Sequence, residues 1–333
     1  MESIAPESPD QTPSASDGSV GLPALEDQVS VMPESSPIMT QTPDRCWTAI
    51  AVIGVSLLCF IVASGVMVVV ATMYVHGSFS PKVLSNPENF RAVTQSPTGL
   101  FLLVVLPQFA LVFPCLIAAV LSPTPTMQRL ALVRGNWPIW TWFAAMLATP
   151  LVGLISGVVV SLFMEESATL KEMSDIFRQQ GQTGFTSLLI LMVGVTPALC
   201  EELLFRGYVQ TRMTRVFPPV LGILISSLAF AAFHMDPVHV VAVFPLGLFL
   251  GWLTWQSGSL FPAILAHFGN NAVSVLVTIF ATDTDTGTLS LPALEFTAAI
   301  LLLGCLGMIA TLVVSIMYRR PATLPNSTSA PPV

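Results

Sequence analysis

The sequence predicts an all-α polytopic membrane protein with about eight transmembrane helices and a site inside the helix bundle. Hydrophobic residues make up 53% of the 333-residue chain and charged residues only 9%, against roughly 25% charged residues in soluble domains. Apolar runs of roughly 20 residues, long enough to cross a hydrocarbon core of about 30 Å, recur from Trp47 onward. Lipid offers the backbone no hydrogen-bonding partner, so these runs should be helical.

The first 45 residues are predicted to be a disordered acidic tail. They hold eight acidic residues and one arginine, which accounts for the formal net charge of −7, and they are rich in Pro and Ser. Such a segment buries too little apolar area to offset the entropy of ordering it. The rest of the chain is balanced in charge and has no basic patch, so no nucleic-acid partner is expected.

Eight apolar segments are predicted to be membrane helices. They cover approximately Trp47–Val75, Gly99–Leu121, Ile139–Phe163, Phe185–Tyr208, Pro219–His234, Val238–Trp255, Ser259–Ala281 and Pro292–Tyr318. The fifth and sixth are short and adjoin at Pro237, so their boundary is the least well defined. A short amphipathic helix around Leu170 to Phe177 should lie in the outer interface, as a simple connector or as a guide for substrate.

The placement of charges predicts that both termini are cytoplasmic. Cytoplasmic loops collect Lys and Arg, and alternate loops of the eight-helix topology do so: Arg129, Arg134, Arg212, Arg215, Arg319 and Arg320. The opposite segments carry Glu165, Glu166, Glu172, Asp175, Asp236, Asp283 and Asp285. Only the first outer loop, with Lys82 and Arg91 against Glu88, departs from this separation.

The fourth segment places charged side chains in the membrane, where insertion of one costs about 2.5 to 3.5 kcal/mol and therefore indicates function. Glu202 and Arg206 are four residues apart and share a helical face, whereas Glu201 is rotated by about 100°. We therefore expect Glu202 to pair with Arg206 and Glu201 to be free for another partner. Pro197 cannot donate to the carbonyl of Val193, so a kink or an open carbonyl is expected beside the acids.

Two further segments bring polar residues toward the same depth. His234 ends the fifth segment at about the same distance from the intervening turn as Glu201, and Phe230 lies one helical turn before it. His267 and Asn271 share a face of the seventh segment, which should turn away from lipid. By themselves these residues are also compatible with helix-to-helix hydrogen bonds. His76 and His239 are interpreted as interfacial, and the five cysteines show no pairing pattern.

The ordered motifs Glu-Glu-x-x-x-Arg, Phe-x-x-x-His and His-x-x-x-Asn resemble those of the CAAX prenyl protease and bacteriocin-processing family, the CPBP or Abi intramembrane proteases. The resemblance covers roughly residues 185 to 281. It implies that Glu201 and His234 activate a water that attacks a peptide carbonyl. It further implies that His267 and Asn271 bind the oxyanion, with Glu202, Arg206 and Phe230 in support.

The resemblance leaves the cofactor open. Glu201, His234 and His267 could supply the three protein ligands of a catalytic Zn²⁺, and the same residues can act without a metal as a glutamate-type peptidase. The expected partners are membrane lipids and a peptide or protein substrate that carries a lipid in some relatives. The expected location is a bacterial cell membrane.

The expected organisation follows from the motifs and the tails. Residues 1–45 form the tail, 46–184 the first three membrane helices and the interfacial helix, 185–281 the catalytic core, 282–320 the eighth membrane helix and 321–333 a short disordered tail. Two other functions remain open. One is a binding or immunity protein that does not cleave; the other is a proton-coupled transporter, which the lack of visible internal repeats disfavours.

Overall fold

Helices form wherever the sequence is continuously apolar, as the membrane requires of the backbone. The computed structural model describes residues 46–78, 80, 83, 86–280 and 291–318, and all regular structure in these ranges is helical. The predicted tails, 1–45 and 321–333, lie outside the described residues, as do Lys82, Asp283, Asp285, Arg319 and Arg320. Within these ranges the all-α prediction is confirmed.

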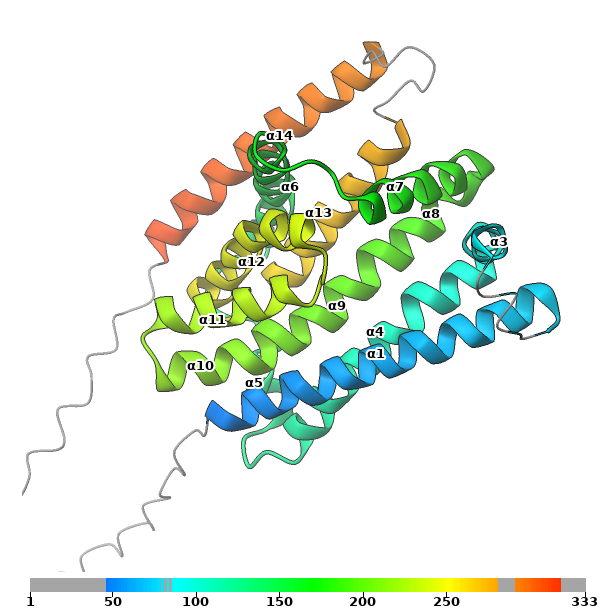
Figure 1. Cartoon of the computed structure of the whole chain (residues 1–333). Helices are drawn as coiled ribbons and strands as arrows, with labels where there is room; N and C mark the ends of the chain where they lie inside the picture. The colour runs from blue at the N-terminus through cyan, green and yellow to red at the C-terminus, as the bar shows by residue number, and fades with distance from the viewer. Residues whose placement is uncertain (1–45, 79, 81–82, 84–85, 281–290, 319–333) are drawn as a thin grey trace, which may run out of the picture. The chain divides into compact units, whose positions relative to one another are not determined.

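Figure 1 shows the order of the helices. The first half consists of α1 (Cys46–His76), α3 (Pro87–Gln95), α4 (Pro97–Val120), α5 (Thr126–Arg129), α6 (Trp140–Ser161) and α7 (Ala168–Gln180). A long run follows, made of η1 (Gly181–Phe185), α8 (Thr186–Leu189), η2 (Ile190–Val195), α9 (Thr196–Glu202), η3 (Leu203–Gln210) and α10 (Thr211–Val216). The chain continues with α11 (Pro219–Ala232), α12 (Pro237–Ser257), α13 (Phe261–Phe280) and α14 (Leu291–Met317).

Seven helices in the described ranges are long and apolar enough to cross a membrane, with the run from α7 to α10 counted once. The predicted span Pro219–His234 is shorter than expected, because α11 ends at Ala232 after 14 residues. At 1.5 Å per residue it is about 21 Å long, less than the roughly 30 Å of a hydrocarbon core. The eight predicted spans are thus seven full-length helices and one short one. Multi-pass membrane topology is confirmed.

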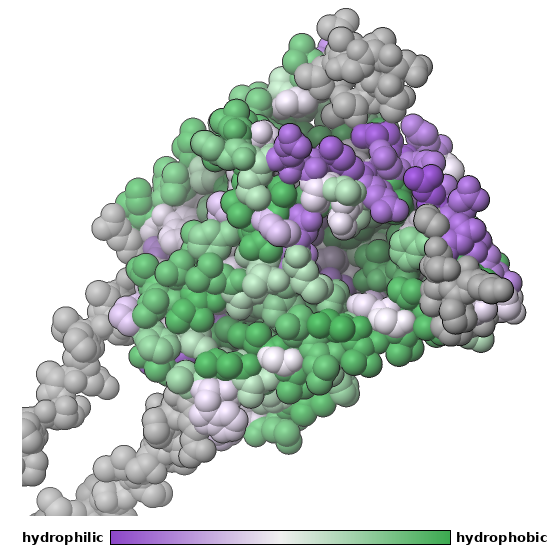
Figure 2. Space-filling view, in the orientation of Figure 1, coloured by the Kyte–Doolittle hydropathy of each residue, from purple (hydrophilic) through white to green (hydrophobic). Residues whose placement is uncertain are grey.

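The predicted amphipathic helix is present as α7. Ser167 caps its first turn by accepting a hydrogen bond from the Leu170 N–H at 3.2 Å. Gly184, with a φ of 83°, breaks the helical path between α7 and the membrane run, since this conformation is accessible to glycine without a steric penalty. Hydrophilic residues gather over α7 and α3 in Figure 2, and apolar residues dominate the surface elsewhere in that view.

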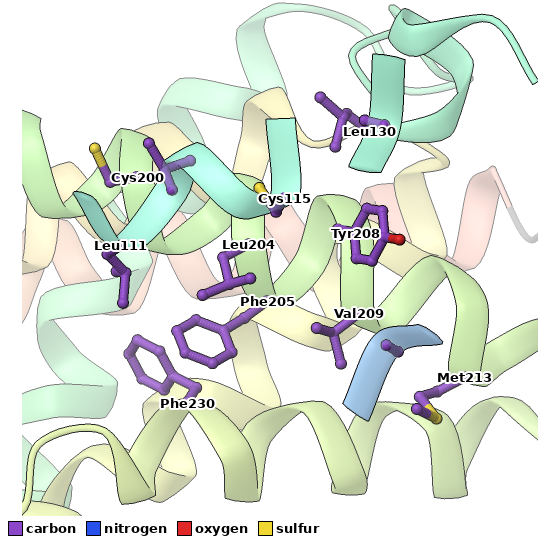
Figure 3. Close-up of a cluster of buried hydrophobic side chains, with 13 residues drawn as sticks. Leu111, Cys115, Leu130, Cys200, Leu204, Phe205, Tyr208, Val209, Met213 and Phe230 are labelled. Atoms are coloured by element: carbon purple, nitrogen blue, oxygen red, sulfur yellow. The ribbon is translucent and has the colours of Figure 1, made fainter. Parts of the chain in front are cut away.

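The run from η2 to α10 is the central element of the bundle. It contacts α4 on one side and α11 and α13 on the other, and α4 also packs against α1. Figure 3 shows the apolar cluster around this run, with Leu111 of α4, Leu204 and Phe205 of η3 and Phe230 of α11 in one layer. The rings of Phe205 and Phe230 meet edge to face at 5.5 Å. This packing fixes the depth of the charged residues that precede η3.

The last helix, α14, is held through close backbone approach to α6. A Cβ at Gly307 would lie 2.6 Å from the carbonyl oxygen of Ala144 and 2.9 Å from the amide nitrogen of Ala148. Small residues at such crossings let membrane helices approach closely. Gly54 of α1, by contrast, is exposed, and a Cβ added there would have no neighbouring atom within 4 Å.

These two glycines give a matched prediction. Gly307→Ala should lower the free energy of unfolding by about 1–3 kcal/mol, because backbone atoms must move to admit the methyl group. Gly54→Ala should leave it unchanged or raise it by about 0.5–1 kcal/mol through helix propensity. Thermal unfolding of both variants in detergent micelles measures the difference. Equal stability of the two variants would contradict the close α6–α14 crossing.

Candidate active site

Glu202 and Arg206 form a fully buried ion pair at the junction of α9 and η3. Arg206 Nη1 donates to Glu202 Oε1 at 2.6 Å, and neither side chain is exposed. Arg206 Nη2 also donates to the backbone carbonyl of Gly247 in α12 at 3.1 Å. The predicted i, i+4 pairing is therefore present, and it ties the central run to α12.

The same carboxylate oxygen holds His267 of α13. His267 Nδ1 lies 2.9 Å from Glu202 Oε1, and the imidazole is 3% exposed. Because Glu202 is already bound to the Arg206 guanidinium as a carboxylate, the ring nitrogen must be the donor. The ring orientation of His267 is thus set, and its Nε2 points away from Glu202.

Phe230 packs among the charged and aromatic residues. The guanidinium carbon of Arg206 lies 4.2 Å from the centre of the Phe230 ring, within the range of a cation–π contact. The His234 and His267 rings meet Phe230 edge to face at 5.2 and 5.7 Å. The Phe230 ring therefore contacts His234, His267 and the Arg206 guanidinium.

Glu201 is oriented away from its neighbour Glu202 and lies between α4 and α13. Its Oε1 accepts a hydrogen bond from Gln108 Nε2 at 3.0 Å. Its Oε2 lies 3.9 Å from His267 Nε2, too far for a direct hydrogen bond and close enough for one water to bridge the two atoms. Glu201 is 12% exposed, whereas Glu202 has no exposure.

The amide of Asn271 is fixed from two sides. Its Nδ2 donates to the carbonyl of Val193 at 3.1 Å, and its Oδ1 accepts from Asn270 Nδ2 at 3.2 Å. Pro197 has no N–H for that carbonyl. The Val193 carbonyl therefore lacks a donor at Pro197 and accepts a hydrogen bond from the Asn271 amide.

His234 lies at the end of α11 next to a sharp turn. Its Nδ1 is 3.2 Å from the carbonyl oxygen of Phe230; since a carbonyl can only accept, Nδ1 carries the hydrogen and Nε2 of the neutral ring has a free lone pair. Met235, which follows, adopts a φ of 57°, uncommon for a residue with a side chain. This turn brings the ring of His239 to 4.4 Å from that of His234.

Asp236 caps the first turn of α12 and so holds His239 in place. Its Oδ1 accepts a hydrogen bond from the His239 backbone N–H at 3.0 Å. That hydrogen bond, with a second from the Ser167 side chain, holds the pKa of Asp236 below its ordinary value. The cap therefore stays ionised across the neutral range.

The predicted residues surround one cavity of about 380 Å³. The side chains of Glu201, His234, His267 and Asn271 line it, with Phe230 beside them. Glu202 and Arg206 do not line it and lie behind this wall. The apolar residues Leu170, Met173 and Phe177 of α7 form another part of its lining.

Three polar residues that contact the predicted site residues were not among those predicted from the motifs. His239, interpreted as interfacial, lines the cavity beside His234. Asn270, which adjoins Asn271 in the sequence, also lines it and orients the Asn271 amide. The third is Gln108, although an amide in the middle of an apolar helix is a signal that could have singled it out.

The side chains of the site do not converge as the ligands of a catalytic Zn²⁺ would, which was one of the two alternatives that the sequence left open. Nowhere in the described ranges do three or more His, Cys, Asp or Glu side chains converge as metal ligands do. Glu201, His234 and His267 share the cavity wall, and the rings of His234 and His267 each meet the Phe230 ring edge to face. The arrangement does not fit a three-ligand metal centre, so no step below depends on one.

The fold and the site define a multi-pass helical membrane protein with carboxylate, imidazole and amide groups around an internal cavity. Residues 183–273 match the family model described as type II CAAX prenyl endopeptidase, Rce1-like. The match contains all seven site residues predicted from the motifs, and it confirms the family resemblance over that segment and supports a peptidase. No curated protein and no solved structure matches the chain.

Proposed function

We propose that this protein is an intramembrane endopeptidase of the CAAX-protease type, which hydrolyses a peptide bond near the membrane interface. One observation carries the proposal: Glu201, His234, His267 and Asn271 line a single cavity within the segment that matches the endopeptidase family. Residues 185–281 would then be the catalytic core. The helices on either side would hold that core in the membrane.

The nucleophile would be a water held by Glu201 and His234. Glu201 Oε2 and the free Nε2 of His234 are both acceptors, so they can take the two hydrogens of one water molecule. As the water oxygen bonds to the peptide carbonyl carbon, one of its protons passes to this pair. The pair then gives a proton to the leaving amine as the C–N bond breaks, and so acts as base and acid in turn.

The oxyanion would be bound by His267 and Asn271. His267 would bind the oxyanion in the form in which both ring nitrogens carry hydrogen. In that form Nδ1 still donates to Glu202 and Nε2 carries the second hydrogen toward the cavity. The Asn271 amide has one hydrogen beyond the one bound to Val193. Donors fixed in this way stabilise developing charge with little reorganisation.

The proposed substrate is a membrane peptide or protein that carries a lipid. The family description names prenyl endopeptidases, and the α7 residues that line the cavity are apolar (Leu170, Met173 and Phe177). A cavity lined by both apolar and polar side chains suits a chain with a hydrophobic attachment beside the bond to be cut. Membrane lipids are the other expected partners, and no nucleic acid is expected.

We further propose a bacterial cell membrane with both termini in the cytoplasm. The support is that Arg129 and Arg134 lie between α4 and α6, and Arg212 and Arg215 lie in α10 just before the turn to α11, because positive charge collects on the cytoplasmic side of membrane helices. The acidic side of the protein, including Asp236 at the start of α12, would then face outward.

A comparison of membrane peptide fragments tests the function and identifies the substrate together. Membranes containing the wild-type protein should yield fragments that are absent from membranes containing equal amounts of Glu201→Ala or of His234→Ala. The reason is that each change removes one of the two acceptors for the attacking water. Identical fragment patterns from all three proteins would overturn the proposed function. A proton-coupled flux in proteoliposomes would then favour the transporter.

A further inference from the structure

Gln108 is an isolated polar residue in a membrane helix. Beyond Thr98 near its start, α4 carries no other amide, hydroxyl or charged side chain over its 24 residues. An amide group inside the hydrocarbon needs a protein partner, because lipid supplies none. The position of Gln108 therefore indicates a specific contact within the bundle.

That contact is with Glu201, 93 residues further along the chain. Gln108 Nε2 donates to Glu201 Oε1 at 3.0 Å, across the packed pair α4 and α9. The Oε1 atom of Gln108 is buried and has no hydrogen-bond partner within the described ranges. An ionised carboxylate has only acceptors, so it accepts only from the NH₂ side of the amide. The orientation of Gln108 thus serves Glu201 and leaves its own oxygen unsatisfied.

The contact selects which oxygen of Glu201 is available. With Oε1 held by Gln108, Oε2 is the atom that faces His267 Nε2 at 3.9 Å. A glutamate has several rotatable bonds, and a reacting group must be held close to its productive geometry by the residues around it. Among the residues that the structure describes, Gln108 makes the one hydrogen bond seen to the Glu201 side chain.

We propose that Gln108 is a positioning residue for the Glu201 base, and this inference rests on the proposed function. The helix that carries it, α4, lies outside the segment matched by the family model, residues 183–273. The first membrane helices thus complete the site, in addition to anchoring it. A general base misplaced by about 1 Å can lose on the order of 10²-fold in rate.

Three substitutions in the full-length protein test this role, assayed on a peptide found in the fragment comparison. Gln108→Met keeps the length and removes the donor, so kcat should fall by about 10- to 100-fold while KM stays within about threefold. Gln108→Asn keeps the amide on a stem one methylene shorter, so its kcat should fall by a similar factor. Gln108→His, whose ring N–H reaches farther than the Asn amide, should recover most of kcat. Phe109→Met, on the exposed face of α4, is the matched control.

The outcomes separate the two proposals. Cleavage by the wild type with an unchanged kcat for Gln108→Met overturns the positioning role alone. If kcat falls together with the melting temperature in both Gln108→Met and Gln108→Asn, the positioning role is also overturned, because a structural role of Gln108 would explain the loss of kcat. No cleavage by the wild type overturns the proposed function and this assignment with it. A selective loss of kcat with an unchanged melting temperature, recovered in Gln108→His, supports the assignment.

Discussion

Glu201→Gln is expected to lower kcat by about 10²- to 10⁴-fold, the usual contribution of a general base. The substitution preserves shape, and the oxygen of the new amide can still accept from Gln108. What is lost is the second acceptor oxygen facing His267, on which the proposed activation of water depends. Steady-state kinetics on a peptide from the fragment comparison, with protein in detergent or nanodiscs, measure the effect.

A second glutamate on a membrane helix supplies the control for this substitution. Glu295 of α14 is exposed, so Glu295→Gln should leave kcat within about twofold, as expected for a surface change. The melting temperature of Glu201→Gln should stay close to that of the wild type. If the kcat of Glu201→Gln equals that of the wild type, Glu201 is not the general base of the reaction.

Arg206→Met is expected to lower the free energy of unfolding by about 3–5 kcal/mol, the cost of leaving a buried charge without its partner. Glu202 would keep only His267 as a donor. The bond to the Gly247 carbonyl and the stacking on Phe230 would also be lost. Unfolding by heat or by a denaturing detergent in micelles gives the difference.

The matched control is an ion pair at the surface. Arg178 and Asp175 in α7 are 3.1 Å apart and partly exposed, so Arg178→Met should cost no more than about 1 kcal/mol. A double variant, Glu202→Gln with Arg206→Met, removes both charges and should recover part of the stability lost in Arg206→Met. Equal costs for Arg206→Met and Arg178→Met would contradict a buried, coupled pair.

The helices and part of the site could be predicted from local rules. The length and apolarity of the segments predicted the membrane helices, because a segment in lipid must satisfy its backbone hydrogen bonds within itself. The pairing of Glu202 with Arg206 follows from helical spacing alone. The open carbonyl of Val193 follows from Pro197, which lacks an N–H. Each of these features depends on residues within one turn or two of each other.

The features that sequence reasoning missed depend on packing between distant helices. The partner of Gln108 is fixed by how α4 meets α9, which no local pattern encodes. His239 looked distant from the site because four residues, one of them Pro237, separate it from His234. The turn at Met235, with its positive φ, reverses the chain and brings the two rings together. The same turn ends α11 at Ala232, two residues before the predicted end of that span.

The ion pair between Glu202 and Arg206 also bears on how the protein is made. Both residues belong to one helical stretch, four positions apart, so their charges can neutralise each other as soon as that stretch becomes helical on leaving the ribosome. The segment can then enter the lipid before the later helices, with Gly247 and His267, have been synthesised. A pair divided between two helices would expose each charge to the membrane until its partner arrived.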